Sequence, residues 1–219
     1  MPQISTVVFD LDGTLVRYHG VEFESSWGAI AAAAGMQAES QLLLDEFLSR
    51  PHAYSEWVRR DAALLAGIPV NRVTRQIFPP PYAAGVRGTI DRLRARCSFG
   101  ILSSGVDLVA EYVREDLGFE FAVANCLFVK DGHFTGESET RVHLWEKDRV
   151  MRQIAIERNL SLSDVCYVGD HLNDIPVMQI VGLAIAFNPK DEKLEEVADY
   201  STRDFAEIPD YIEAFEGGR

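Results

Sequence analysis

The sequence predicts an α/β protein, a doubly wound, Rossmann-like parallel sheet with a helical segment inserted after the first strand. From Tyr82 onward, short apolar runs alternate with amphipathic helical patterns, the order typical of parallel strands joined by helices. Between Val16 and about Pro81 the periodicity is helical and no convincing strand is present. We therefore expect a core of residues 1–15 and 82–219 and a helical cap of residues 16–81, with Pro79 to Pro81 at the boundary.

The first strand is expected in the apolar, β-branched run that begins at Thr6. Gly13 allows a sharp turn after it, and Thr14 is placed to cap the next segment. In the inserted segment, helical periodicity predicts four helices, at residues 27–35 (with Gly35 as C-cap), 39–47, 54–65 and 70–78. We expect Trp27, Trp57 and Phe78 to be packing residues of these helices, with a position facing the substrate as the alternative for some of them.

The second part of the chain alternates regularly between the two kinds of structure. Apolar runs predict strands at residues 97–102, 121–124, 164–168 and 183–187. Amphipathic patterns predict helices at 85–96, 107–117, 146–159, 175–181, 191–198 and 205–215. Asp131-Gly132 stands between two alternating runs and predicts a β-hairpin over residues 127–136.

Composition narrows the class of protein. No apolar run reaches ~18 residues, so no transmembrane helix is expected, and the N-terminus has no signal-peptide pattern. The three scattered cysteines fit buried, reduced thiols, which favours a cytoplasmic location. A formal net charge of −13 argues against nucleic acid or an anionic membrane as partner. It also requires any phosphate site to be locally positive.

Four predicted strands end in residues suited to phosphate or metal. These endings are Asp10 with Asp12, Ser103-Ser104-Gly105, Gly169-Asp170, and Asn188. In a parallel sheet such ends lie along one edge, where ligands of open α/β sheets bind. One such ending could be an ordinary turn, but four at one edge predict a site.

The acids carry the chemistry of this predicted site. Asp10 and Asp12 suit a nucleophilic carboxylate and a carboxylate for proton transfer, with a divalent cation between them; the alternative is an ordinary strand-to-loop turn. Asp170 could complete an oxygen shell suited to Mg²⁺. Asp174 could hold the metal's water ligands or orient a ligand. For these last two acids the alternative is helix capping.

Other residues are candidates for binding a phosphoryl group. Ser103, Ser104 and Gly105 precede a helix, so their N–H groups and hydroxyls could cradle it, although a plain N-cap is the simpler interpretation. Lys147 could neutralise phosphate oxygens, although an isolated helix lysine is usually exposed to solvent. Asn173 adds an amide at the same edge.

Taken in order, these motifs resemble those of the haloacid dehalogenase (HAD) superfamily, and within it the phosphoserine phosphatase-like branch. The resemblance rests on Asp10-Leu11-Asp12-Gly13-Thr14, Ser103, Lys147 and Gly169-Asp170-x-x-Asn173-Asp174. It extends to Leu127–Gly136 before the lysine and to Phe187-Asn188-Pro189-Lys190 near the end, and so covers about Val7 to Asp199. Such proteins have a HAD-like core with a helical cap between the first two motifs.

The resemblance implies a Mg²⁺-dependent phosphatase that acts on a small phosphomonoester. It implies that Asp10 forms an aspartyl-phosphate, and that Asp12 protonates the leaving alcohol and then activates water. Mg²⁺ would be held by Asp10, the backbone carbonyl of Asp12, and Asp170. Ser103 and Lys147 would stabilise the transferring oxygens. Phosphoserine phosphatase proper, in serine biosynthesis, and phosphotransfer to an alcohol are alternatives within enzymes. A non-catalytic phosphate-binding module is an alternative from another class.

Two departures bear on the substrate. Phosphoserine-specific members carry a Glu after the first motif and an Arg in the cap, which fall at His19 and near Asp61 here. Glu22, Arg59 and Arg60 lie close by in sequence. His171 stands where a glycine is more usual, which is expected to narrow the mouth of the pocket. The expected assembly is a monomer or homodimer.

Overall fold

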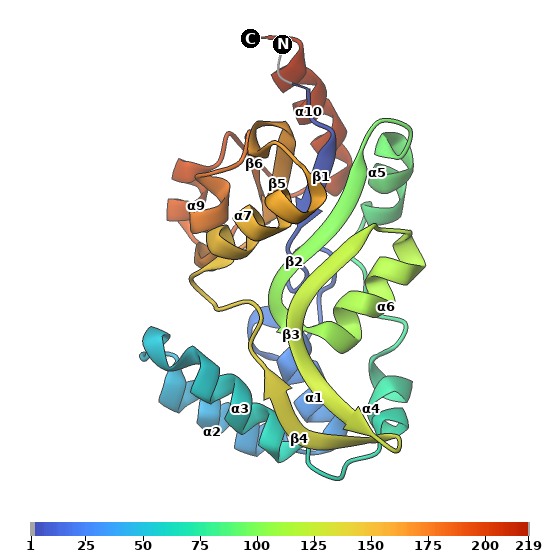
Figure 1. Cartoon of the computed structure of the whole chain (residues 1–219), viewed down its shortest axis with the longest axis vertical. Coiled ribbons are helices and arrows are strands. Elements are labelled where there is room, and N and C mark those ends of the chain that lie inside the picture. Colours follow the sequence, from blue (N-terminus) through green and yellow to red (C-terminus); the bar gives the residue numbers. More distant parts are fainter. Residues whose placement is uncertain (1–2, 219) are drawn as a thin grey trace.

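The computed structural model describes residues 3–218, and its centre is a seven-stranded sheet (Figure 1). The sheet order is β4-β3-β2-β1-β5-β6-β7, and every neighbouring pair is parallel except β3 and β4. The strands are β1 (Thr6–Phe9), β2 (Ser98–Val106), β3 (Phe121–Lys130), β4 (His133–Glu139), β5 (Val165–Gly169), β6 (Leu183–Phe187) and β7 (Tyr200–Thr202). The predicted doubly wound fold is confirmed.

Helices cover both faces of the sheet because successive strand residues point to opposite sides. Val7 and Phe9 of β1 join the apolar cluster of α5 (Val86–Leu93), α6 (Asp107–Leu117) and α10 (Ile208–Glu216). Val8 joins the cluster on the other face with α7 (Lys147–Arg158), α8 (Ile175–Met178) and α9 (Glu192–Val197). All three cysteines are buried and unpaired, as the composition predicts.

The inserted segment folds into α1 (Ser26–Ala34), α2 (Gln37–Phe47), α3 (Tyr54–Leu64) and α4 (Val70–Ile77). Gly35 ends α1 in the left-handed region, with φ of 81°, as expected for a C-cap glycine. The hairpin of β3 and β4 reaches these helices (Figure 1). Three backbone hydrogen bonds join the hairpin to the inserted segment. The N–H groups of Gly67 and Val70 donate to the carbonyls of Phe134 (2.8 Å) and Gly132 (2.9 Å), and the N–H of Phe134 donates to the carbonyl of Ile68 (3.0 Å).

The hairpin prediction is confirmed, with Asp131 (φ 50°) and Gly132 (φ 75°) both left-handed, as a tight two-residue turn requires. Other expectations were wrong. Ser103–Gly105 lie within β2 and not after it, because β2 continues to Val106, which pairs with Asn125 of β3. Strand β3 is much longer than predicted, and β7 was missed because three residues are too few to show a period. Thr14 caps no helix; its hydroxyl donates to Asp170 Oδ1 at 3.3 Å.

No helix within residues 3–218 combines the length and apolar character needed to cross a bilayer.

Candidate active site

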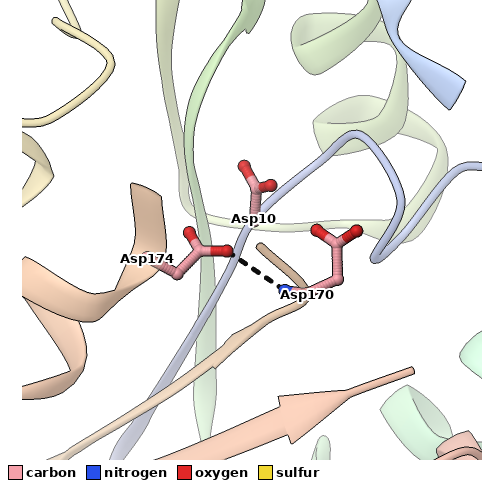
Figure 2. Close-up of side chains that lie close together, drawn as sticks. All are labelled: Asp10, Asp170 and Asp174. Atoms are coloured by element: carbon pink, nitrogen blue, oxygen red, sulfur yellow. Dashed lines mark hydrogen bonds between the residues drawn. The ribbon is translucent and has the colours of Figure 1, made fainter. Parts of the chain in front are cut away.

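The ends of β1 and β5 bring three acids together (Figure 2). Carboxylate oxygens of Asp10, Asp170 and Asp174 lie within 4.8 Å of one another, and all three side chains are buried. Asp10 directly follows β1 and Asp170 directly follows β5, which is the strand beside β1 in the sheet. The predicted convergence is therefore seen for the ends of β1 and β5. Asn188, the fourth predicted strand ending, belongs neither to this cluster nor to the lining of the adjoining cavity.

Lys147 is completely buried and is not exposed to solvent as an isolated helix lysine usually is. Its Nζ lies 2.9 Å from Asp10 Oδ1 and 2.6 Å from Asp174 Oδ1. Burial alone would lower the pKa of Lys147, but these two carboxylates raise it above its ordinary value. The lysine therefore carries a fixed positive charge beside Asp10, which meets the requirement for local positive charge in an acidic protein.

Asp174 serves to organise the cluster. One oxygen accepts hydrogen bonds from Lys147 Nζ (2.6 Å) and Tyr167 OH (2.7 Å). The other accepts from the backbone N–H groups of Asp170 (3.0 Å, Figure 2) and His171 (3.1 Å). The capping role considered from the sequence is thus present, together with an ion pair that the sequence did not reveal.

Asp12 is held by a residue of the cap. Ser26, fully buried at the start of α1, donates its hydroxyl to Asp12 Oδ2 at 2.7 Å. The N–H of Val106 in turn donates to Ser26 Oγ at 3.1 Å, which fixes the hydroxyl between cap and core. Burial raises the pKa of Asp12 to about 7, and the Ser26 hydrogen bond opposes that rise. Asp12 is thus suited to exchange a proton near neutral pH.

The predicted phosphate-binding residues of β2 and the loop after β5 line the same cavity as Asp10 and Asp12. Ser103 is buried, and its Oγ accepts a hydrogen bond from the N–H of Gly105 at 3.1 Å. Asn173 donates Nδ2 to Ser104 Oγ at 3.3 Å, while its buried Oδ1 has no partner. Gly105 is required by space, because a Cβ there would lie 2.5 Å from Asp12 Oδ2.

The acid cluster fits a hard divalent cation. Burial, followed by the charge of Asp10, raises the pKa of Asp170 to about 8, and Lys190 opposes that rise. Burial also raises the pKa of Asp10, with Lys147 opposing. Carboxylates that destabilise one another in this way are stabilised by a cation with oxygen ligands. The side chain of Asp12 lies outside the three-acid cluster, so its predicted metal contribution is its backbone carbonyl alone.

Lys190 is a further residue of the site. It belongs to the segment of residues 187–190 that resembles the family, but the sequence assigned it no role. Its Nζ lies 2.9 Å from Asp170 Oδ2 and 3.5 Å from Glu24 Oε2. Ser26 was missed altogether, because a serine before an alanine-rich helix indicates only a cap. The contact of Ser26 with Asp12, which is 14 residues away, and that of Lys190 with Asp170 span more than one element, so local periodicity gives no signal for either.

A cavity of about 410 Å³ opens between these residues and the cap. Trp27 and Trp57 line it, which is the alternative left open for these rings, whereas Phe78 stacks on Tyr112 as a packing residue. His171 lines it as well, with its ring 5.6 Å from that of Phe23.

His19 and Asp61 stand where phosphoserine-specific members of the family carry a Glu and an Arg, and they do not reproduce that pair of side chains. His19 is directed to Glu24 Oε1 at 3.2 Å and does not line the cavity, while Asp61 does. Glu22 also lines the cavity, but Arg59 and Arg60 do not.

Comparison with known proteins gives consistent results. A family model described as haloacid dehalogenase-like hydrolase matches residues 7–179. A phosphoserine phosphatase of Methanocaldococcus jannaschii is 33% identical over 211 residues, which cover 94% of this chain and 96% of that protein. One from Lactococcus lactis is 31% identical over 192 residues, covering 84% and 83%.

Solved structures agree. A phospho-aspartyl intermediate analogue of phosphoserine phosphatase superposes with a TM-score of 0.78 at 30% identity, covering 95% of this chain and 99% of the other. A substrate-bound phosphoserine phosphatase complex gives the same TM-score and identity, covering 96% and 99%.

Proposed function

The chain belongs to the haloacid dehalogenase-like hydrolases, and we propose that it hydrolyses a small phosphomonoester through an aspartyl-phosphate on Asp10. The observation that carries this proposal is the buried contact between Asp10 and Lys147 at the end of β1, with Asp12 two residues away. Lys147 favours the ionised, nucleophilic form of Asp10 and attracts an anionic ester.

The first step makes one bond and breaks another. A carboxylate oxygen of Asp10 attacks phosphorus, and the bond from phosphorus to the alcohol oxygen breaks. Asp12, protonated at the start, gives its proton to that departing oxygen. The pKa of Asp12, about 7, supports this role because the acid form is available near neutrality.

The second step returns the enzyme to its starting state. Asp12, now a carboxylate, takes a proton from water, and the water oxygen attacks the phosphorus of the aspartyl-phosphate. The bond from phosphorus to Asp10 breaks, and inorganic phosphate leaves.

The remaining predicted residues bind and orient the phosphoryl group. Ser103, Ser104, Gly105, Lys147 and Asn173 would donate hydrogen bonds to its oxygens. Three lines of support are the burial of Ser103, the fixed charge of Lys147, and the link from Asn173 to Ser104.

Mg²⁺ is the proposed cofactor. Asp10, Asp170 and the backbone carbonyl of Asp12 would hold it, with Asp174 reaching its water ligands. When bound, the ion offsets the repulsion between the carboxylates and an anionic ester.

Phosphoserine phosphatase proper is the second candidate, because the similar proteins named above carry that activity in their names. His19 and Asp61 stand where phosphoserine-specific members carry a Glu and an Arg, which weighs against this activity. A cytoplasmic location, a monomeric or homodimeric state and the absence of nucleic-acid or membrane partners remain predictions from the sequence.

Purified protein with Mg²⁺ and 4-nitrophenyl phosphate tests the proposal. We expect release of inorganic phosphate that stops on addition of EDTA and resumes with excess Mg²⁺. The Asp10→Asn variant should lose activity by several orders of magnitude. Full activity of this variant would contradict the nucleophile assignment, and no turnover of any phosphate ester would favour a binding module.

A further inference from the structure

The cavity between cap and core includes the space for the phosphoryl group beside Asp10 and extends from there into the cap as far as Leu44 and Leu48. Its volume of about 410 Å³ lies within the range of roughly 300–1,000 Å³ that holds small organic ligands. The aliphatic lining from the cap includes Ala31, Leu44 and Val58. A three-carbon amino acid would leave most of this apolar surface without contact.

Aromatic rings form a wall that starts at the phosphate-binding strand. Trp27 donates Nε1 to the carbonyl oxygen of Ser104 at 3.2 Å, and Tyr54 donates its hydroxyl to the same oxygen at 2.8 Å. Trp57 packs edge-on against Tyr54, with ring centroids 6.0 Å apart. Because the polar groups of Trp27 and Tyr54 already bond to the protein, these two residues offer a substrate ring surface more than hydrogen bonds.

The charged residues that line the cavity disfavour a substrate with a carboxylate. Asp61, 8% exposed, and Glu22 line the cavity in addition to the catalytic acids. Among the described residues of the lining there is no arginine, and Lys190 is the one lysine. Asp170 and Glu24 already surround its ammonium group. A carboxylate on the substrate would therefore be buried beside like charges, with no unpaired cation among the described lining residues to offset its charge.

From these contacts we propose that the natural leaving group is a bulky, mainly apolar alcohol, aromatic or branched, that carries no carboxylate. The inference rests on the proposed phosphatase function and specifies its substrate class. The phosphoryl group lies at the strand ends, and the alcohol lies along Tyr54, Trp57 and Leu44. Apolar contact favours such an alcohol, and the acids Asp61 and Glu22 disfavour an amino acid.

The test compares kcat/KM for 2-phenylethyl phosphate and for phosphoserine, with Mg²⁺ at neutral pH. We expect the phenylethyl ester to be preferred by about tenfold or more, because even one methylene group in an apolar pocket changes kcat/KM by ~10–200-fold. The hydroxyl of serine is the more acidic of the two alcohols and so the better leaving group. A preference for the phenylethyl ester therefore comes from the enzyme and not from intrinsic reactivity.

Two leucines on the same helix provide a matched pair of variants. Leu44 of α2 lines the cavity, whereas Leu42 is 70% exposed and does not line it. Leu44→Ala should lower kcat/KM for 2-phenylethyl phosphate about tenfold and that for methyl phosphate by much less. Leu42→Ala should change neither.

The outcomes distinguish failure of the substrate inference from failure of the proposed phosphatase function. Equal or better turnover of phosphoserine would overturn the inference and leave the phosphatase function intact. So would turnover of 4-nitrophenyl phosphate without turnover of 2-phenylethyl phosphate, or equal effects of the two leucine variants. If no ester is hydrolysed under any condition, the proposed function fails, and this inference fails with it.

Discussion

At the scale of single residues, the proton-transfer group depends on the hydrogen bond between Ser26 and Asp12. The hydroxyl of Ser26 is 2.7 Å from Asp12 Oδ2 and is itself fixed by the N–H of Val106. The hydrogen bonds of the Ser26 hydroxyl join it to Asp12 and Val106, so its effect on catalysis passes through Asp12. It is a positioning residue that orients the carboxyl group toward the departing oxygen.

Replacing Ser26 with Ala should lower kcat about tenfold while changing KM by less than about twofold. A hydrogen bond to a charged group contributes ~1.5–3 kcal/mol, and this one acts on proton transfer more than on substrate binding. Steady-state kinetics with 4-nitrophenyl phosphate and an aliphatic ester measure the effect, which should be larger for the ester with the poorer leaving group.

A control separates this effect from simple loss of stability. Thr89 is buried and donates to the carbonyl of Phe205 at 2.8 Å, away from the site. Thr89→Val should lower stability and leave kcat unchanged. If kcat of Ser26→Ala stayed within twofold of the wild type, the positioning role would be wrong.

Asp61 is a buried acid whose ionisation opposes folding. Burial raises its pKa from 3.8 to about 6, although the hydrogen bond from Ser40 and the charge of Arg60 oppose the rise. Between pH 4 and 6 the folded state thus binds more protons than the unfolded state. Stability from this group is greatest at low pH and falls as pH rises through that window.

Asp61→Asn should therefore stabilise the protein more at pH 8 than at pH 5. The neutral amide has no charge to bury, so the gain over the wild type should grow by about 1.4 kcal/mol between these two values. Urea unfolding of both proteins at each pH measures it. A gain that stays constant or shrinks with rising pH would show that Asp61 is not held with a raised pKa.

Single residues differ in how far the sequence could predict them. Asp10 and Asp170 were predictable because each directly follows an apolar strand, and Asp12 because it stands two residues after Asp10. Lys147 was predictable as a candidate, but its complete burial was not, because helical periodicity does not show which opposing strand ends a side chain reaches. The role of Ser26 depends on the position of α1 against β2, which no local pattern specifies.

At the scale of elements, the end of β2 brings cap and core together. The register of β2 on β3 shifts between Leu102 and Val106, and such an irregularity redirects the strand. It brings Gly105 so close to Asp12 that a Cβ would lie 2.5 Å from Oδ2 and 2.7 Å from Ser26 Oγ. The close packing of Asp12, Ser26 and the end of β2 therefore requires that residue 105 has no side chain.

Gly105→Ala should lower kcat/KM by about a hundredfold, since a displacement of ~1 Å at a reacting group can have that effect. Gly88→Ala is the matched control, because a Cβ at Gly88 of α5 meets nothing within 4 Å. That control should keep full activity and gain up to ~1 kcal/mol of stability from better helix propensity. Unaltered kinetics of Gly105→Ala would contradict the close packing of the glycine against Asp12 and Ser26.

The success of the element predictions followed the strength of the local signal. β6 agreed with the prediction residue for residue, because five apolar residues stand between clear turns. The length of β3 and the existence of β7 were not predictable, because both depend on neighbouring strands: β3 on β2 and β4, and β7 on β6. Propensity alone does not encode such pairing.

At the scale of the whole molecule, a net charge of −13 is combined with a site that holds two lysines. Lys147 and Lys190 each contact a carboxylate of the acid cluster, so the acidic protein provides positive charge at the site.

The buried apolar residues of the cap, such as Ile30 and Leu65, belong to the same apolar core as Phe9 and Ile101 of the sheet. Cap and core are thus joined both by apolar packing and by the hydrogen bonds to Ser104.

The most direct test of the central claim is to trap the phosphoenzyme. The Asp12→Asn variant cannot activate water, but 4-nitrophenyl phosphate needs no acid to expel its leaving group. Mixing the two with Mg²⁺, quenching in acid and sequencing peptides by mass spectrometry should show one phosphoryl group, on Asp10. The Asp10→Asn/Asp12→Asn double variant should show none. A phosphoryl group on another residue, or rapid turnover by Asp12→Asn with no trapped phosphoenzyme, would contradict the account.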